Sequence, residues 1–147
     1  ELAKTLTNKP IVLTDTGEWS FWTKATKYGD QVGVNIYPIV YKSGKYSHRL
    51  EPIWLYRFKK WLSNKSNKPI IVAELQAEPW GPGSVKDQPK SEWINSISPE
   101  KLEKNIKLAQ AAGFQEVWFW GVEWWVFLLG QDDDSMWRKA KEIVNQN

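Results

Sequence analysis

The feature that most constrains the fold is a fourfold alternation of short apolar runs with stretches of helical periodicity. Residues 10–13, 31–41, 68–74 and 116–121 are rich in apolar and β-branched side chains, and a loop and then a helical stretch follow each of them. Near-continuous apolar strands are typical of a parallel sheet with right-handed helical crossovers. We therefore expect an α/β fold of four consecutive βα units, with parallel strands and helices outside.

Capping residues mark the ends of the expected helices. One helix occupies about residues 19–28, and another begins at Pro52. Ser98 and the proline after it are a typical helix start, and Gly113 is a typical helix end. Asp133 or Asp134 is expected to cap the last helix.

Length and composition exclude several classes of protein. A chain of 147 residues can build one core, so we interpret residues 1–147 as a single domain. The net charge of +3 comes from scattered lysines, and no run approaches the roughly 20 apolar residues of a membrane span. We expect neither a nucleic-acid partner nor a membrane partner. The chain begins at Glu1 without a visible signal peptide, which suggests a processed or excised product, and its localisation stays open.

No metal or cofactor is expected. The chain has no cysteine and a single histidine, His48, which lacks a second ligand at metal-binding spacing. The acidic run at 132–134 is better explained as a helix N-terminus than as a calcium loop. A glycine-rich phosphate loop is also missing, which argues against a nucleotide-binding sheet.

Two carboxylates at the end of the third apolar run are the strongest candidates for chemistry. Glu74, Gln76 and Glu78 have the same parity, so in an extended chain they point the same way, and Trp80 follows them. A pair of carboxylates beside an aromatic platform is what glycoside hydrolysis requires. The alternative for Glu74 is a carboxylate hydrogen-bonded to a neighbouring strand end or a helix N-terminus, and for Glu78 it is a solvent-exposed loop acid.

The chain has eleven tryptophans, which suggests aromatic binding surfaces as well as core. Trp61 and Trp137 have helical spacing among apolar neighbours and are interpreted as structural. Trp80, Trp120, Trp124 and Trp125 lie at or after strand ends, where they are candidates for binding a ligand.

Taken in order, these motifs resemble one enzyme clan. Asp30-x-x-Gly33-x-Asn35-x-Tyr37-Pro38, followed by a helix and by Lys68-Pro69-Ile70-Ile71-Val72-Ala73-Glu74, is similar to the sixth and seventh strands of retaining glycoside hydrolases with a (β/α)8 barrel. That clan includes cellulases, mannanases and β-galactosidases. Trp118-Phe119-Trp120-Gly121 resembles the end of the eighth strand. The resemblance implies a TIM half-barrel equivalent to the C-terminal half of the fold, although a doubly wound sheet also fits the alternation.

The resemblance also implies roles for residues. Glu74 would be the nucleophile, oriented by Tyr37, and Glu78 a substitute for an acid/base glutamate whose usual strand would precede Glu1. The remaining candidates are sugar-binding residues, each of which could instead have a structural role: Glu18, Asn35, Tyr37, Gln76, Trp80, Trp120, Glu123 and Trp124.

We therefore expect a carbohydrate ligand and β-glycosidase chemistry by double displacement. The alternatives are a non-catalytic carbohydrate binder and a purely structural or engineered half-barrel. Because a four-stranded parallel sheet leaves two open edges, we expect a homodimer, or a complementary half, to complete the barrel.

Overall fold

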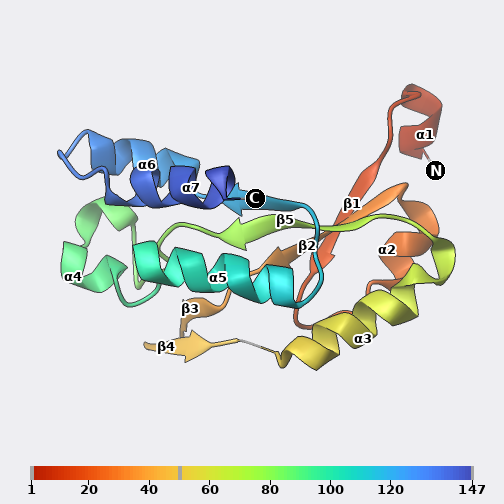
Figure 1. Cartoon of the computed structure of the whole chain (residues 1–147), viewed down its shortest axis with the longest axis horizontal. Helices are drawn as coiled ribbons and strands as arrows, with labels where there is room; N and C mark the ends of the chain where they lie inside the picture. Colours follow the sequence, from red (N-terminus) through yellow and green to blue (C-terminus); the bar gives the residue numbers. More distant parts are fainter. Residues whose placement is uncertain (1, 50, 147) are drawn as a thin grey trace.

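The computed structural model describes residues 2–49 and 51–146 (Figure 1) and has a four-stranded parallel sheet at its centre. The strands are β1 (Val12–Thr16), β2 (Gln31–Ile36), β5 (Ile70–Gln76) and β6 (Val117–Trp120), in the order β1-β2-β5-β6. All three neighbouring pairs are parallel. Helices alternate with the strands, so the predicted α/β fold with a parallel sheet is confirmed.

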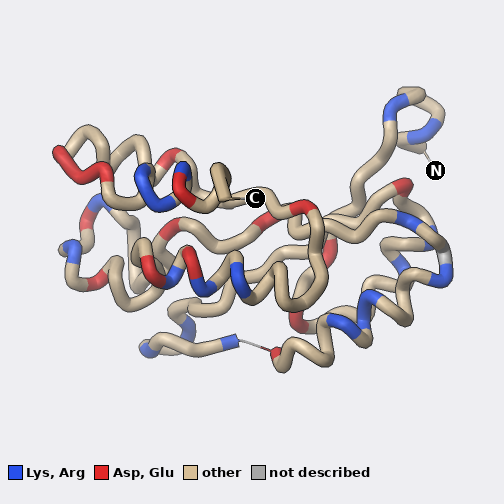
Figure 2. The backbone as a smooth tube through the Cα atoms, in the orientation of Figure 1, with Lys and Arg blue, Asp and Glu red and all other residues tan. Residues whose placement is uncertain are grey.

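Short and long helices connect the strands. Their bounds are α1 (Leu2–Leu6), α2 (Thr23–Tyr28), α3 (Ile53–Ser63), α4 (Lys90–Trp93), α5 (Pro99–Ala111), α6 (Val122–Leu129) and α7 (Ser135–Asn145), with 3₁₀ turns η1 (Asn64–Ser66) and η2 (Val85–Asp87). No helix of the described residues is long and apolar enough to cross a membrane. Lysines and arginines are spread over several of these elements and alternate with acids along α5 (Figure 2).

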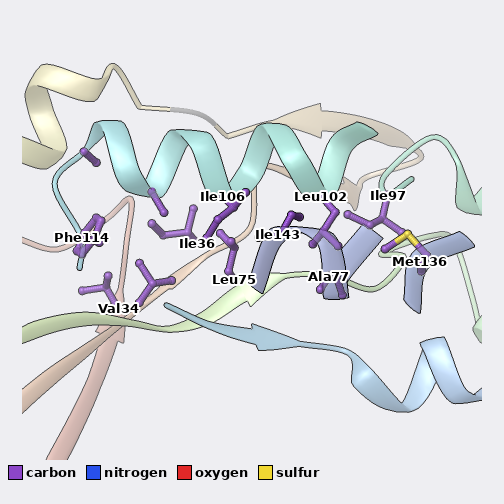
Figure 3. Packing of buried hydrophobic residues seen from close by; sticks show 14 of the residues in the cluster. Val34, Ile36, Leu75, Ala77, Ile97, Leu102, Ile106, Phe114, Met136 and Ile143 are labelled. Atoms are coloured by element: carbon purple, nitrogen blue, oxygen red, sulfur yellow. The ribbon is translucent and has the colours of Figure 1, made fainter. Parts of the chain in front are cut away.

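The hydrophobic core lies on one face of the sheet. Val34 and Ile36 of β2 and Leu75 of β5 are fully buried, and Ile106 of α5 packs over them (Figure 3). Val12, Thr14, Gly33 and Ala73 lie together on the opposite face. A Cβ atom at Gly33 would come within 2.5 Å of the Ala73 Cβ, so β2 and β5 approach each other closely there.

The sequence indicates a strand over residues 31–41 with a break at Pro38, and in the structure the two sides of that break belong to different sheets. β2 ends before Tyr37, and an antiparallel hairpin follows, made of β3 (Ile39–Lys42) and β4 (Lys45–His48). The break falls at Pro38, which has no N–H to donate to a sheet ladder. Ser43 and Gly44 both have positive φ, as a tight two-residue hairpin turn requires.

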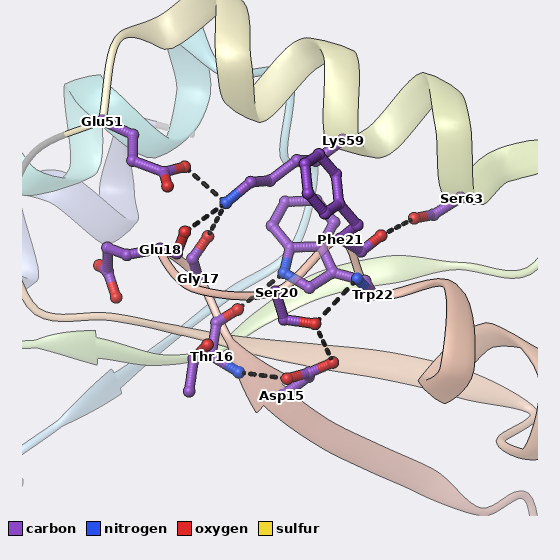
Figure 4. Close-up of polar contacts among 10 residues, drawn as sticks. All are labelled: Asp15, Thr16, Gly17, Glu18, Ser20, Phe21, Trp22, Glu51, Lys59 and Ser63. Atoms are coloured by element: carbon purple, nitrogen blue, oxygen red, sulfur yellow. Dashed lines mark hydrogen bonds and ion pairs between the residues drawn. The ribbon is translucent and has the colours of Figure 1, made fainter.

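The first expected helix begins later than predicted. The Ser20 hydroxyl accepts a hydrogen bond from the Trp22 N–H and donates one to Asp15, which holds residues 19–22 outside the helix (Figure 4). Trp22 has a φ of 59°, and α2 starts at Thr23. The Trp22 ring itself is fully buried, and its indole donates to the Thr16 carbonyl.

The face of α3 that packs inward is not the aromatic one. Trp54, Phe58 and Trp61 are 66%, 43% and 65% exposed, whereas Tyr56 and Lys59 are buried. The interpretation of Trp61 as a structural residue is therefore wrong. Lys59 occupies the inward face because its ammonium group binds carbonyl oxygens of the loop after β1.

The later helices largely follow their sequence signals. The Ser98 hydroxyl accepts from the Lys101 N–H at the start of α5, and Gly113 has a φ of +85° beyond its end. The Asp133 carboxylate accepts from the Ser135 N–H at the start of α7. The sequence did not predict α6, because its run of apolar residues has no polar stripe.

Candidate functional site

A cavity of about 560 Å³ opens at the carboxyl ends of the parallel strands. Glu18 follows β1, Asn35 lies in β2, Tyr37 follows β2 and Glu74 lies near the end of β5, and all four line the cavity. In parallel sheets these ends come together at one edge, which is where α/β enzymes place their chemistry. Six of the ten predicted site residues therefore meet in one cavity, the other two being Trp80 and Trp120.

Strand register sets the order of the polar residues across the sheet. Thr16 of β1 pairs with Asn35 of β2, and Asn35 pairs with Glu74 of β5. The β2–β5 register shifts just before Asn35, which marks an irregularity in the pairing next to the site. Such irregularities are common beside active sites because they re-aim side chains.

Tyr37 and Glu74 form the best-defined contact in the cavity. The Tyr37 hydroxyl donates a hydrogen bond of 2.9 Å to Oε2 of Glu74. Burial raises the pKa of the Tyr37 hydroxyl well above its usual range, and the bond to Glu74 and the charges of Glu74 and Glu78 raise it further. At neutral pH Tyr37 is therefore a neutral hydrogen-bond donor.

Aromatic rings form much of the cavity wall. The Tyr37 ring meets Trp80 edge-on with 5.2 Å between ring centroids. Trp19, Trp80 and Trp120 all line the cavity and are all exposed, so part of each indole is open to a ligand. Exposed indoles around a polar centre suit a ligand with flat apolar faces and polar edges.

Glu18 has an unusual environment for a carboxyl group. Burial, followed by the negative charge of Glu51, raises the pKa of Glu18 to about 7, although backbone N–H groups and Arg49 oppose the rise. Among the described residues, no donor reaches its buried Oε1 atom. The buried Oδ1 of Asn35 likewise has no donor within the described part of the chain.

A buried lysine holds the loop that carries Glu18. Nζ of Lys59 donates to the carbonyl oxygens of Gly17 and Glu18 at 3.0 Å and 2.6 Å, and it pairs with the Glu51 carboxylate at 2.6 Å (Figure 4). The Gly17 N–H donates to the Asn35 carbonyl at 2.9 Å. A Cβ at Gly17 would lie 2.6 Å from the same oxygen, so only glycine fits there.

Glu78 and Glu123 lie beside the cavity rather than in its wall. Burial and the charge of Glu123 raise the pKa of Glu78, while a hydrogen bond with the Trp120 side chain lowers it. The Glu78 side chain packs against Gly121: a Cβ atom added at Gly121 would lie 2.3 Å from the Cβ of Glu78. Glu123 is exposed in the first turn of α6.

Two predicted sugar-binding residues are buried away from the cavity. Gln76 is fully buried. Its side-chain oxygen accepts from the N–H of Ile39, at the start of β3, and its Nε2 donates to the Ile39 carbonyl. Trp124 lies in the core, with its ring edge-on to Trp93 at 5.9 Å. Trp125, the neighbouring candidate, is also in the core, and its indole donates to the Ala77 carbonyl. We correct these assignments to structural roles.

The hairpin supplies cavity residues that the sequence reasoning missed. Tyr41 and Lys42 of β3 and Arg49 after β4 line the wall, as does Trp19. The Ser43-Gly44 dipeptide between two β-rich runs was the available hairpin signal. Nothing in the sequence placed that hairpin over the sheet edge.

Among the described residues, no group of three or more histidine, cysteine or acidic side chains could hold a metal ion. Comparison with protein-family models finds no matching family, and comparisons with curated proteins and with solved structures find no match.

Proposed function

We propose that this chain carries the nucleophile side of a retaining β-glycosidase site, with Glu74 as the nucleophile. The observation that carries the proposal is the hydrogen bond from Tyr37 to Oε2 of Glu74, inside a tryptophan-lined cavity at the strand ends. That bond fixes the carboxylate and leaves Oε1 to attack an anomeric carbon. Fixing a nucleophile before the substrate arrives is a large part of catalysis.

The architecture supports the proposal. Sequential order in an all-parallel sheet with right-handed crossovers places the connecting helices on one face, as in a (β/α)8 barrel, whereas a doubly wound sheet reverses its order. The core lies on one face, and Asn35 and Glu74 line a cavity at the strand ends, which is the arrangement expected for the outside and the mouth of a barrel wall. We therefore propose that the sheet is a (βα)4 half-barrel.

Four further strands are needed to close such a barrel. Parallel sheets are almost always covered on both faces, and open edges are templates for further pairing. We propose that a second copy, related by a two-fold axis, or a complementary half-barrel covers the open face. Light scattering at micromolar concentration tests the homodimer, and a stable monomer contradicts it.

Covalent trapping is the sharpest test of Glu74. Aryl 2-deoxy-2-fluoro-β-glycosides of the gluco, galacto and manno series form long-lived glycosyl esters with a retaining nucleophile. We expect a mass increase of one fluorosugar on the peptide containing Glu74, and none in Glu74→Gln. Glu116→Gln is the matched control, because Glu116 is exposed and lies at the opposite end of β6.

A carbohydrate-binding role without catalysis is the second candidate. It is favoured by the exposure of Trp19, Trp80 and Trp120 around one cavity. Sugar-dependent quenching of tryptophan fluorescence, without trapping or turnover, would support this role. The absence of quenching, trapping and turnover would instead leave a structural half-barrel.

A further inference from the structure

The geometry points to Glu18 as the acid/base residue that works with Glu74 in this cavity. The inference rests on the proposed glycosidase function and assigns the second half of its chemistry. The sequence suggested Glu78, or an acid from a second half-barrel, for this role. The cavity wall contains Glu18 and Glu74 but not Glu78.

The two carboxyl groups approach the cavity from different strands. Thr16, Asn35 and Glu74 form one row across β1, β2 and β5, and Glu18 lies two residues beyond Thr16. The ends of that row lie two strand spacings of about 4.8 Å each apart, with β2 between them. Glu18 and Glu74 thus reach the same cavity from strand ends two strands apart, and a sugar ring would lie over Asn35 between them.

The position of Glu18 is fixed from two sides. The Lys59 ammonium group binds the carbonyl oxygen of Glu18 itself, and the preceding Gly17 is bonded to Asn35. The ammonium group of Lys59 pairs with the Glu51 carboxylate. Lys59 therefore holds the loop through backbone carbonyl oxygens and leaves the Glu18 carboxyl group unpaired with it. A proton donor needs this kind of fixed placement to act in a transition state.

The protonation state of Glu18 suits both halves of the reaction. A pKa raised to about 7 means that the protonated and ionised forms are both populated near neutral pH. The described charged and titratable groups that interact with the Glu18 carboxyl are Arg49, Glu51 and Tyr56, and Lys59 binds the carbonyl oxygen of the same residue. The backbone N–H of Tyr37 also lowers the pKa of Glu18. Its Oε1 atom accepts no hydrogen bond from the described residues.

Glu78 is less suited to the role. Its carboxylate is engaged by the Trp120 side chain, and its side chain packs tightly on Gly121. No side chain of the described residues makes such a bond to the Glu18 carboxyl. The two acids therefore differ in access to the cavity rather than in acidity alone.

The chemistry is a balanced double displacement. Oε1 of Glu74 forms a bond to the anomeric carbon as the glycosidic C–O bond breaks, and Glu18 gives its proton to the departing oxygen, which leaves as an alcohol. A water molecule then attacks the anomeric carbon, the bond to Glu74 breaks, and Glu18 takes the proton of that water.

Leaving-group dependence tests the assignment with Glu18→Gln. For a poor leaving group, such as a methyl or phenyl β-glycoside, we expect kcat/KM to fall by roughly 100-fold or more. For a dinitrophenyl β-glycoside, which needs no proton, we expect kcat/KM to change little. Added azide should restore turnover of the activated substrate and yield a glycosyl azide, and the pH profile should lose its limb near 7. Glu116→Gln serves again as the matched control.

Each outcome decides a separate point. If fluorosugars label Glu74 but Glu18→Gln behaves like the control on poor leaving groups, Glu18 is not the acid and the proposed function stands. If the unmodified protein is neither labelled nor active, both proposals fail together. Glu18→Asp is the control for misfolding. It keeps a carboxyl group, so its pH profile should keep the limb near 7 although its rate is lower. If kcat/KM fell equally for all substrates in both Glu18 variants, and azide did not restore turnover, the assignment would also be overturned.

Discussion

The Tyr37 hydroxyl lies 2.9 Å from Oε2 of Glu74, and the ring of the same tyrosine meets Trp80 edge-on. This one side chain therefore joins the end of β2 to the end of β5 and to the loop after β5. It orders the candidate nucleophile and an aromatic wall of the cavity at the same time.

Tyr37→Phe should separate these two roles, because it removes the hydroxyl and keeps the ring. Losing a hydrogen bond to a charged group costs about 1.5–3 kcal/mol, so kcat/KM for an aryl β-glycoside should fall roughly 10- to 150-fold. KM should change less than kcat, since the ring contact with Trp80 remains. Tyr28→Phe, at an exposed position on α2, is the control. Equal activity of the two variants would contradict the orienting role.

Glu18→Gln should change the pH dependence of stability. Folding raises the pKa of Glu18 from its ordinary 4.5 to about 7, so the folded state binds more protons than the unfolded state between these values. The wild-type protein therefore loses stability from this group as pH rises through that window, by about 3 kcal/mol at most. Glutamine carries no charge, so the variant should be more stable than wild type at pH 8 by about 1–3 kcal/mol and equal to it near pH 4. Urea unfolding at both pH values measures the difference, and a difference independent of pH would show that Glu18 is not a buried acid.

Lys59→Met should destabilise the fold strongly. The Lys59 side chain is 3% exposed, and its loss leaves the half-buried Glu51 charge and two loop carbonyls without their donor. Breaking a buried ion pair by removing one partner costs about 3–5 kcal/mol. Lys65→Met, at an exposed position in η1, is the control, and the double variant Lys59→Met/Glu51→Gln should recover part of the loss. Denaturant midpoints measure all three, and similar midpoints for Lys59→Met and Lys65→Met would contradict the structure.

Gln76→Leu should lower the free energy of unfolding, although Gln76 does not line the cavity. The leucine fits a buried site, but the N–H and carbonyl of Ile39 lose their partners. Each buried unsatisfied group costs about 1–3 kcal/mol, so the free energy of unfolding should fall by roughly 2–4 kcal/mol. Gln115→Leu, at an exposed position, should be nearly neutral. If Gln76→Leu were as stable as wild type but lost sugar binding, its original assignment as a binding residue would be right.

Trp19→Ala should weaken sugar binding with little effect on stability. Its side chain is 79% exposed and lines the cavity. An aromatic contact is worth about 0.5–1.5 kcal/mol, which corresponds to a loss of roughly 2- to 13-fold in affinity. Trp54→Ala removes an equally large exposed indole from α3, outside the cavity, and should leave affinity unchanged. Calorimetric titration of both variants with the same oligosaccharide compares them directly.

Much of the site could be predicted because it follows strand ends. Glu74, Tyr37 and Trp80 were located from short apolar runs and the loops after them, and all three lie in the cavity. Carboxyl ends of neighbouring parallel strands must meet, whatever the details of packing. The helix caps at Ser98 and Gly113 were predictable for the same reason, since they depend on local backbone chemistry.

Burial could not be predicted in the same way. Gln76 has the parity of Glu74, but the start of β3 covers it and takes both of its hydrogen bonds. The aromatic stripe of α3 looked like a core face, yet Lys59 faces inward because a distant loop offers it carbonyl oxygens. Trp124 follows a strand end and still lies in the core, because α6 turns it against Trp93.

The sequence by itself therefore determined the alternation of four parallel strands with helices and several residues at the strand ends, because apolar periodicity and capping act over a few neighbouring residues. Only the tertiary structure decided which polar groups are buried and desolvated. The raised pKa of Glu18 arises where the loop after β1 is held against β2 and α3, and such desolvation comes from segments far apart in the chain.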